Sequence, residues 1–280
     1  MIVSVDKLRK SFSSKPVLND ISFNVEQGDI FAIVGPNGAG KTTTLRCIFG
    51  EIAPEGGEVK VFGENVTSRT KEKIAVMTED RLTFRRFLGE DYLRMWRMLY
   101  PGWQEKVFAS FAVHYKFNLN ERVETYSMGM KTLFHIALTV ASGADLLILD
   151  EPTQSLDPVI RQEVMGVLRD YVLQEGKTMI ISSHEIYDLE EIAGSFAVVL
   201  EGKVLYSDTI DGAKETHRII PKGQAIPSGE IIGVTGEETL VRTDEEAGRF
   251  PNFKEIVLGY LQSKKAFAPF KEEFRPRFKI

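Results

Sequence analysis

The sequence predicts an α/β protein built on a mainly parallel sheet, and three observations support this fold class. Short apolar runs, typical of buried parallel strands, occur at Asp29–Val34, Leu146–Leu149 and Thr178–Ile181. Segments with helical spacing separate these runs, and strands that alternate with helices favour a parallel sheet. The first run leads into a glycine-rich loop, Gly35–Gly40, and then into a predicted helix at Lys41–Phe49 that Gly50 would end.

Further strands, helices and a hairpin complete the pattern. Apolar residues that alternate or cluster predict strands, and apolar residues at helical spacing predict helices. The predicted strands are Ile2–Val5, Ile21–Val25 and Glu58–Phe62, the hairpin joins Phe196–Leu200 to Val204–Tyr206, and the helices are Met128–Ala141, Val159–Leu173 and Lys254–Leu261.

Changes in composition predict the domain organisation. Leu, Met, Trp, Phe and Arg at helical spacing between Arg86 and Phe117, broken at Pro101-Gly102, predict two helices of a helical subdomain at about 82–142. The main domain is predicted at 1–210, and a small C-terminal accessory region punctuated by proline and glycine at 211–280. The basic, aromatic tail Lys264–Ile280 leaves three alternatives open: a solvated terminus, a segment docked on this chain or its twin, or a contact with a membrane face or permease.

Composition excludes several classes of protein. The 280 residues are 43% hydrophobic and 27% charged, which is typical of globular proteins. A net charge of −5 argues against nucleic acid as a partner. Cys47 is the one cysteine, so no internal disulfide forms and a cytoplasmic location fits. The N-terminus does not resemble a secretory signal, and no stretch reaches the ~20 apolar residues of a membrane span, so we expect any service to a membrane to come from outside the lipid.

The glycine-rich loop predicts a nucleotide phosphate site. It matches G-x-x-x-x-G-K-[ST], in which backbone N–H groups surround phosphate oxygens, the lysine contacts the β and γ phosphates, and the hydroxyl binds Mg²⁺. A chance match is the alternative, but the loop lies between a predicted strand and a predicted helix, as the motif requires. The predicted nucleotide-binding residues here are Gly35, Pro36, Asn37, Gly38, Ala39, Gly40, Lys41, Thr42 and Thr43.

Two carboxylates end the apolar strand at Leu146–Leu149 and predict the catalytic part of the same site. Asp150, at the strand tip, can hold Mg²⁺ through water. Glu151 can lie beside the γ-phosphate and orient the attacking water. The alternative is a strand that simply ends in a solvated acidic turn.

Four motifs in this order, GPNGAGKT, YSMGMK, LLILDEPTQSLDP and IISSHE, resemble the ABC ATPase family over Met1 to Leu205. Other P-loop proteins share only the first motif. The resemblance implies a P-loop NTPase fold of the ABC type, with an antiparallel β subdomain and an inserted helical subdomain beside the mainly parallel sheet. It also implies that the chain binds and hydrolyses ATP with Mg²⁺.

The resemblance also assigns roles at matching positions. Ser127 and Gly129 lie in the signature segment, which in this family contacts ATP held by the other subunit; an ordinary helix cap is the alternative for Ser127. Ser155-Leu156-Asp157 resembles the D-loop that links the two sites of the dimer. His184 resembles the switch histidine that contacts the γ-phosphate. Phe12 resembles the aromatic residue that stacks on adenine, and a core phenylalanine is its alternative.

Glu79 departs from the family pattern. It stands where the family has a glutamine that binds Mg²⁺ and responds to the membrane partner. A glutamate still offers oxygen to Mg²⁺, so we expect Glu79 to bind the metal. Its extra negative charge near the γ-phosphate is expected to slow hydrolysis or change coupling.

The segments Met95–Trp103 and Phe253–Leu261 resemble the ATPase subunits of bacterial ABC-2-type exporters. One phosphate loop and one signature segment in the chain imply a head-to-tail dimer, with a second copy or a paralogous ATPase subunit. The expected partner is an integral membrane permease on a separate chain, at the inner face of the cell membrane. The alternative is a soluble ABC ATPase that is not coupled to a permease.

Overall fold

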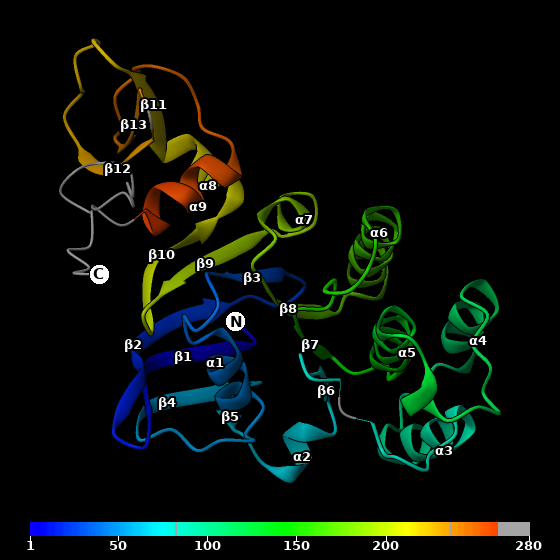
Figure 1. Ribbon diagram of the computed structural model, residues 1–280. Coiled ribbons are helices and arrows are strands. Elements are labelled where there is room, and N and C mark those ends of the chain that lie inside the picture. The colour runs from blue at the N-terminus through cyan, green and yellow to red at the C-terminus, as the bar shows by residue number, and fades with distance from the viewer. Residues whose placement is uncertain (82, 236, 263–280) are drawn as a thin grey trace, which may run out of the picture. The chain divides into compact units, whose positions relative to one another are not determined.

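The computed structural model describes residues 1–81, 83–235 and 237–262. The chain divides into two compact units, Met1–Gly212 and Ala213–Ile280 (Figure 1). The predicted tail Lys264–Ile280 lies outside the described residues, so its three alternatives stay open.

The large sheet of the first unit is mainly parallel, as predicted. Its strand order is β10-β9-β3-β8-β7-β6, where neighbours are parallel except for the antiparallel pair β9 and β10. The strands are β3 (Ile30–Val34), β6 (Ile74–Met77), β7 (Leu146–Asp150), β8 (Thr178–Ser183), β9 (Ser195–Leu200) and β10 (Lys203–Thr209). The register pairs Val34 with Ser183 and Asp150 with Ser182, so the carboxyl ends of β3, β7 and β8 meet at one edge. Chain segments far apart in sequence meet at this edge.

A second sheet is antiparallel and packs against the helix that follows the glycine-rich loop. Its order is β2-β1-β4-β5, with β1 (Val3–Phe12), β2 (Lys15–Val25), β4 (Gly56–Val61) and β5 (Glu64–Asn65). The first two strands extend beyond the predicted Ile2–Val5 and Ile21–Val25, because pairing along the hairpin continues past the apolar residues. Helix α1 (Lys41–Ile48) lies between the two sheets, and its Leu45 and Ile48 enter a core built from both.

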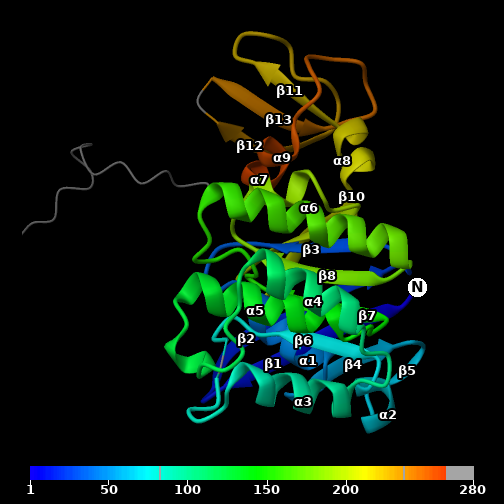
Figure 2. The ribbon, with the colours of Figure 1, turned by 90° about the vertical axis from the view of Figure 1, so that its right-hand side faces the viewer.

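Several other helices of this unit lie on the opposite side of the large sheet from α1, the side that faces the viewer in Figure 2. They include α5 (Met128–Ala141) and α6 (Pro158–Glu175), and the two helices predicted between Arg86 and Phe117, α3 (Gly89–Leu99) and α4 (Glu105–His114). The shorter elements α2 (Ser68–Lys71), η1 (Val123–Thr125) and α7 (Ile186–Glu190) were not predicted. None of the helices formed by residues 1–81, 83–235 and 237–262 is long and apolar enough to cross a membrane.

The second unit is a small antiparallel sheet with a helix against it. Its order is β11-β13-β12, and the elements are α8 (Ile210–Thr216, across the unit boundary), β11 (His217–Pro221), β12 (Glu230–Thr235), β13 (Glu238–Arg242) and α9 (Phe253–Leu261). Helix α9 packs on β12 and β13 and buries Phe253, Ile256 and Val257. Its N-cap Asn252 accepts a hydrogen bond from the Glu255 N–H. The predicted helix at Lys254–Leu261 is therefore confirmed.

Candidate functional site: a phosphate loop facing two carboxylates

The glycine-rich loop connects β3 to α1 and depends on its glycines at two positions. A side chain at Gly35 would place its Cβ 2.2 Å from the Val199 carbonyl oxygen, so the loop leaves β3 only with glycine there. Gly40 has a φ of 107°, which L side chains rarely adopt, and it is the N-cap residue of α1. The loop therefore carries the chain directly into the N-terminus of α1, where free N–H groups favour anions.

Lys41 points back into the loop. Its side chain is 6% exposed, and its Nζ donates to the carbonyl oxygens of Gly35 at 2.8 Å and Pro36 at 3.4 Å. The same nitrogen lies 3.3 Å from Oε1 of Glu151 as an ion pair. A buried cation thus lies beside the loop and already faces one negative group.

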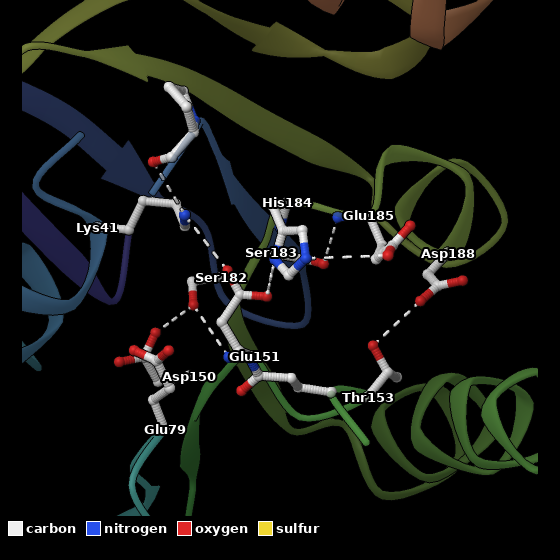
Figure 3. Close-up of polar contacts among 12 residues, drawn as sticks. Lys41, Glu79, Asp150, Glu151, Thr153, Ser182, Ser183, His184, Glu185 and Asp188 are labelled. Carbon is white, nitrogen blue, oxygen red and sulfur yellow. Dashed lines mark hydrogen bonds and ion pairs between the residues drawn. The ribbon is translucent and has the colours of Figure 1, made fainter. Parts of the chain in front are cut away.

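Glu151 follows β7 and is held from both sides. Its φ of 49° is rare for a residue with a side chain. Its N–H donates to the carbonyl and hydroxyl oxygens of Ser182, both at 3.1 Å, and its Oε2 lies 2.8 Å from Nδ1 of His184 (Figure 3). Its Oε1 is buried and, among the described residues, has the ion pair with Lys41 as its polar contact.

Asp150, Thr42 and Glu79 supply oxygen atoms at the neighbouring position. Burial raises the pKa of Asp150, and the negative charges of Glu79 and Glu151 raise it further, while hydrogen bonds from the Ser182 and Thr42 hydroxyls lower it. Figure 3 shows the Glu79 and Asp150 carboxyl groups close together. Crowded negative charge in a buried place favours a divalent cation, and oxygen is the donor that Mg²⁺ prefers.

The fit to Mg²⁺ depends on the nucleotide as well as on the chain. Within 1–81, 83–235 and 237–262, no three His, Cys, Asp or Glu side chains converge as a metal cluster. Mg²⁺ is usually bound by one or two carboxylates together with substrate phosphates, and a hydroxyl and two carboxylates beside a phosphate loop match that arrangement.

A cleft of about 290 Å³ opens between these groups. Its lining residues are Val17, Asn37, Gly38, Gly40, Lys41, Thr42, Thr43, Glu79 and Glu151. Most of the predicted phosphate loop, together with Glu79 and Glu151, therefore faces one hollow, whereas Asp150 and His184 are not among its lining residues. Gly35, Pro36 and Ala39 do not line it; they form the turn behind, where the Ala39 N–H donates to the Pro36 carbonyl at 3.2 Å.

Comparisons with known proteins agree with this geometry. The family model described as ABC transporter matches residues 18–154. The chain is 27% identical to the lantibiotic transport ATP-binding protein SrtF of Streptococcus pyogenes, over 78% of this chain and 95% of that one. It is 32% identical to the Nod factor export ATP-binding protein I of Paraburkholderia xenovorans, over 72% of this chain and 68% of that one.

The chain belongs to the ABC transporter ATP-binding protein family. A solved structure described as the ATP-binding subunit of an ABC transporter superposes with a TM-score of 0.69 at 25% identity, over 76% of this chain and 92% of that one. The fold is thus that of a P-loop NTPase of the ABC type, and the chain is an ABC ATPase that binds ATP.

The segment predicted as the ABC signature, at Ser127 and Gly129, lies outside the cleft. Ser127 is exposed, and its hydroxyl accepts a hydrogen bond from the Met130 N–H at 3.2 Å, as the N-cap of α5. A side chain at Gly129 would place its Cβ 3.3 Å from the Ser155 carbonyl oxygen, so the signature segment touches the segment that resembles the D-loop. Neither Ser127 nor Gly129 is among the described residues that line the cleft.

Phe12 and three further residues show where sequence reasoning fell short for this ABC ATPase. The core alternative for Phe12 is wrong, since the ring is 44% exposed at the end of β1; it does not line the cleft, and its role at adenine stays a prediction. Val17, Ser182 and Arg81 contribute to the site and were missed. The place of Arg81 two positions after Glu79 was no signal by itself, since an arginine usually lies on the surface.

Proposed function

We propose that the chain is the ATP-hydrolysing subunit of an ABC exporter of the ABC-2 type, and that it works as a head-to-tail dimer with a membrane permease on a separate chain. The names of the two relatives above refer to lantibiotic transport and Nod factor export, which supports transport out of the cell. The second subunit is another copy of this chain or a paralogous ATPase, and the complex lies at the inner face of the cell membrane.

The observation that carries the proposal is that one chain supplies only part of a nucleotide site. The cleft is lined by the phosphate loop, Glu79 and Glu151, whereas the exposed N-terminus of α5 at Ser127 faces elsewhere. A helix N-terminus favours an anion, and this one has its Ser127 cap and Gly129 available to a phosphate from outside. Two chains arranged head to tail would complete each cleft with the signature segment of the other chain.

The residues have distinct roles in this proposal. Lys41 and the loop N–H groups bind the phosphates of ATP, and Thr42, Asp150 and Glu79 hold Mg²⁺. Mg²⁺ supplies charge neutralisation at the transferred phosphoryl group. Once phosphate oxygens take over Lys41 from Oε1 of Glu151, that oxygen accepts a hydrogen bond from the attacking water, and His184 holds Oε2 and so fixes the orientation of the carboxylate. The helical subdomain at about 82–142 is proposed as the part that the permease contacts.

Mixing two inactive variants tests whether sites form between chains. Lys41→Ala disables the phosphate loop, and Gly129→Asp disables the signature segment. In a mixed dimer of the proposed kind, one site carries both defects and the other carries none. Equal mixing should therefore restore about a quarter of the wild-type ATPase rate, since about half of the dimers are mixed and each has one intact site.

Each variant alone, at the same total concentration, is the control and should be inactive. A mixture as inactive as its components would contradict the two-chain site.

The transport part is tested separately, by co-expression with the membrane protein encoded beside the gene. Failure of the two to co-purify would favour an ABC ATPase that is not coupled to a permease.

A further inference from the structure

Arg81 is a buried cation beside the candidate site that the roles above do not use. Arg81 is 3% exposed and lies in the segment that follows Glu79. Burial lowers the pKa of Arg81, and the charges of nearby carboxylates, Glu79 first among them, offset part of that cost. An apolar side chain of similar size is often neutral or better for stability. Packing alone therefore does not explain an arginine here.

The guanidinium joins two segments of the site through their backbones. One terminal nitrogen, Nη1, donates to the Glu79 carbonyl oxygen at 2.6 Å. The other, Nη2, donates to the Glu151 carbonyl oxygen at 2.6 Å and to the Gln154 carbonyl oxygen at 3.4 Å. The rigid fork of an arginine thus spans the segment that carries Glu79 and the segment that carries Glu151.

The contact to Glu151 falls on a backbone that needs support. A φ of 49° costs of order 1–3 kcal/mol for a residue with a side chain, and it persists only where neighbours hold it. Ser182 holds the N–H side of Glu151, and its carbonyl side accepts from Arg81 at 2.6 Å and from the Gln154 N–H at 3.2 Å. These contacts together fix the peptide groups on both sides of Glu151 and so fix the direction of its side chain, and of the two on the carbonyl side Arg81 is the one that also reaches Glu79.

We propose that Arg81 is a positioning residue for ATP hydrolysis, which couples the backbone at Glu79 to the backbone at Glu151 so that the two segments move together. This inference rests on the proposed role of Glu151 at the attacking water. When the Glu79 segment shifts, the carbonyl group that accepts from Nη1 moves with it. The rigid guanidinium then moves too, and it displaces the Glu151 carbonyl that accepts from Nη2. Movement at the metal side of the cleft thereby controls whether Glu151 is aligned.

Replacement of Arg81 should separate turnover from nucleotide binding. Arg81→Met removes the guanidinium and keeps a long side chain, so the Glu151 carbonyl loses its shortest hydrogen bond and its link to Glu79 while Lys41 and the phosphate loop remain. We expect kcat to fall at least about tenfold, with the affinity for a slowly hydrolysed ATP analogue unchanged within about twofold. Arg81→Lys keeps the charge but cannot span both carbonyls as a fork, so its kcat should lie between those of Arg81→Met and the wild type.

Arg85→Met is the matched control, since Arg85 is exposed in the same segment. It should keep the wild-type kcat and analogue affinity. The full-length variants are compared by phosphate release, by calorimetry with the analogue and by thermal melting.

A wild-type kcat in Arg81→Met would overturn the proposal. The proposal would also be overturned if Arg81→Met lowered kcat and analogue affinity by similar factors and Arg81→Lys recovered neither, because that pattern indicates a merely structural residue. If Arg81→Met does not fold, Arg81→Lys decides: lowered kcat at unchanged affinity supports the proposal, and any other result overturns it. Activity of the wild-type chain and its loss in Glu151→Gln test the proposed function separately.

Discussion

The substitution Glu151→Gln separates nucleotide affinity from turnover more sharply than any other in this site. The Glu151 carboxylate forms an ion pair with Lys41 at 3.3 Å, and both side chains are buried. Phosphate oxygens that bind Lys41 must compete with this carboxylate. An amide has the same shape but no charge, so the substitution removes the competitor and also removes the group that would accept a proton.

The magnitudes of the two effects are unequal. Two unit charges 3.3 Å apart attract by about 5 kcal/mol at an effective dielectric constant of about 20. Only part of this attraction is recovered as tighter nucleotide binding. The amide oxygen of the variant still accepts a hydrogen bond from Lys41, and Lys41 still donates to the Gly35 and Pro36 carbonyls. We expect a net gain of about 1–2 kcal/mol, or about five- to thirtyfold tighter binding of a slowly hydrolysed ATP analogue. Loss of the general base should lower kcat by about 10²–10⁴-fold.

Calorimetry with the analogue and a phosphate-release assay measure the two quantities on the same preparation. Glu175→Gln, an exposed residue at the end of α6, removes the same charge away from the cleft and is the control. It should change neither quantity. A Glu151→Gln variant that turns over at the wild-type rate would remove Glu151 from its proposed role. One that binds the analogue more weakly than the wild type would refute the competition for Lys41.

Substitutions at three further residues have expected outcomes. Lys41→Ala should lower ATP affinity by at least about a hundredfold, because phosphate charge loses its main cation, and unchanged affinity in calorimetry would contradict the phosphate site. Glu79→Gln should keep or raise the basal rate, and Glu79→Ala should need more Mg²⁺ for half-maximal activity; wild-type Mg²⁺ titrations in both would place Glu79 away from the metal. Burial, together with the nearby positive charge of Arg81, lowers the pKa of His135 to about 4. As the pH is lowered, the unfolded chain binds a proton at His135 below pH ~6.5, whereas the folded chain binds it only near pH ~4. The free energy of unfolding therefore decreases as the pH is lowered through this window. Between pH 8 and pH 5 the wild type should lose about 2 kcal/mol more than His135→Gln, as measured by urea unfolding, and equal losses would show that His135 does not titrate in this way.

Local sequence patterns predicted the parts of the site that depend on short-range geometry. The positive φ of Gly40, the apolar strand that ends at Asp150 and the Ser127 cap of α5 are each decided by neighbours within a few residues, whereas the close approach of the Val199 carbonyl to Gly35 is a long-range contact. Backbone freedom, strand burial and helix capping are local properties, and the residue types that satisfy them are few. The parallel strands, the hairpin of β9 and β10 and the helices α3 and α4 were predicted for the same reason.

Only the tertiary structure decided how these parts meet. Strand β8 lies between β3 and β7, and this order brings the ends of the strands, with Lys41 and Glu151, to one edge of the sheet. The positive φ of Glu151 and the burial of Arg81 have no local signal, since both residue types usually lie on the surface in ordinary conformations. The exposure of Phe12 likewise depends on what packs against the end of β1. Long-range packing and hydrogen bonds to distant carbonyls set these features, because their energies come from contacts that a pattern along the chain does not contain.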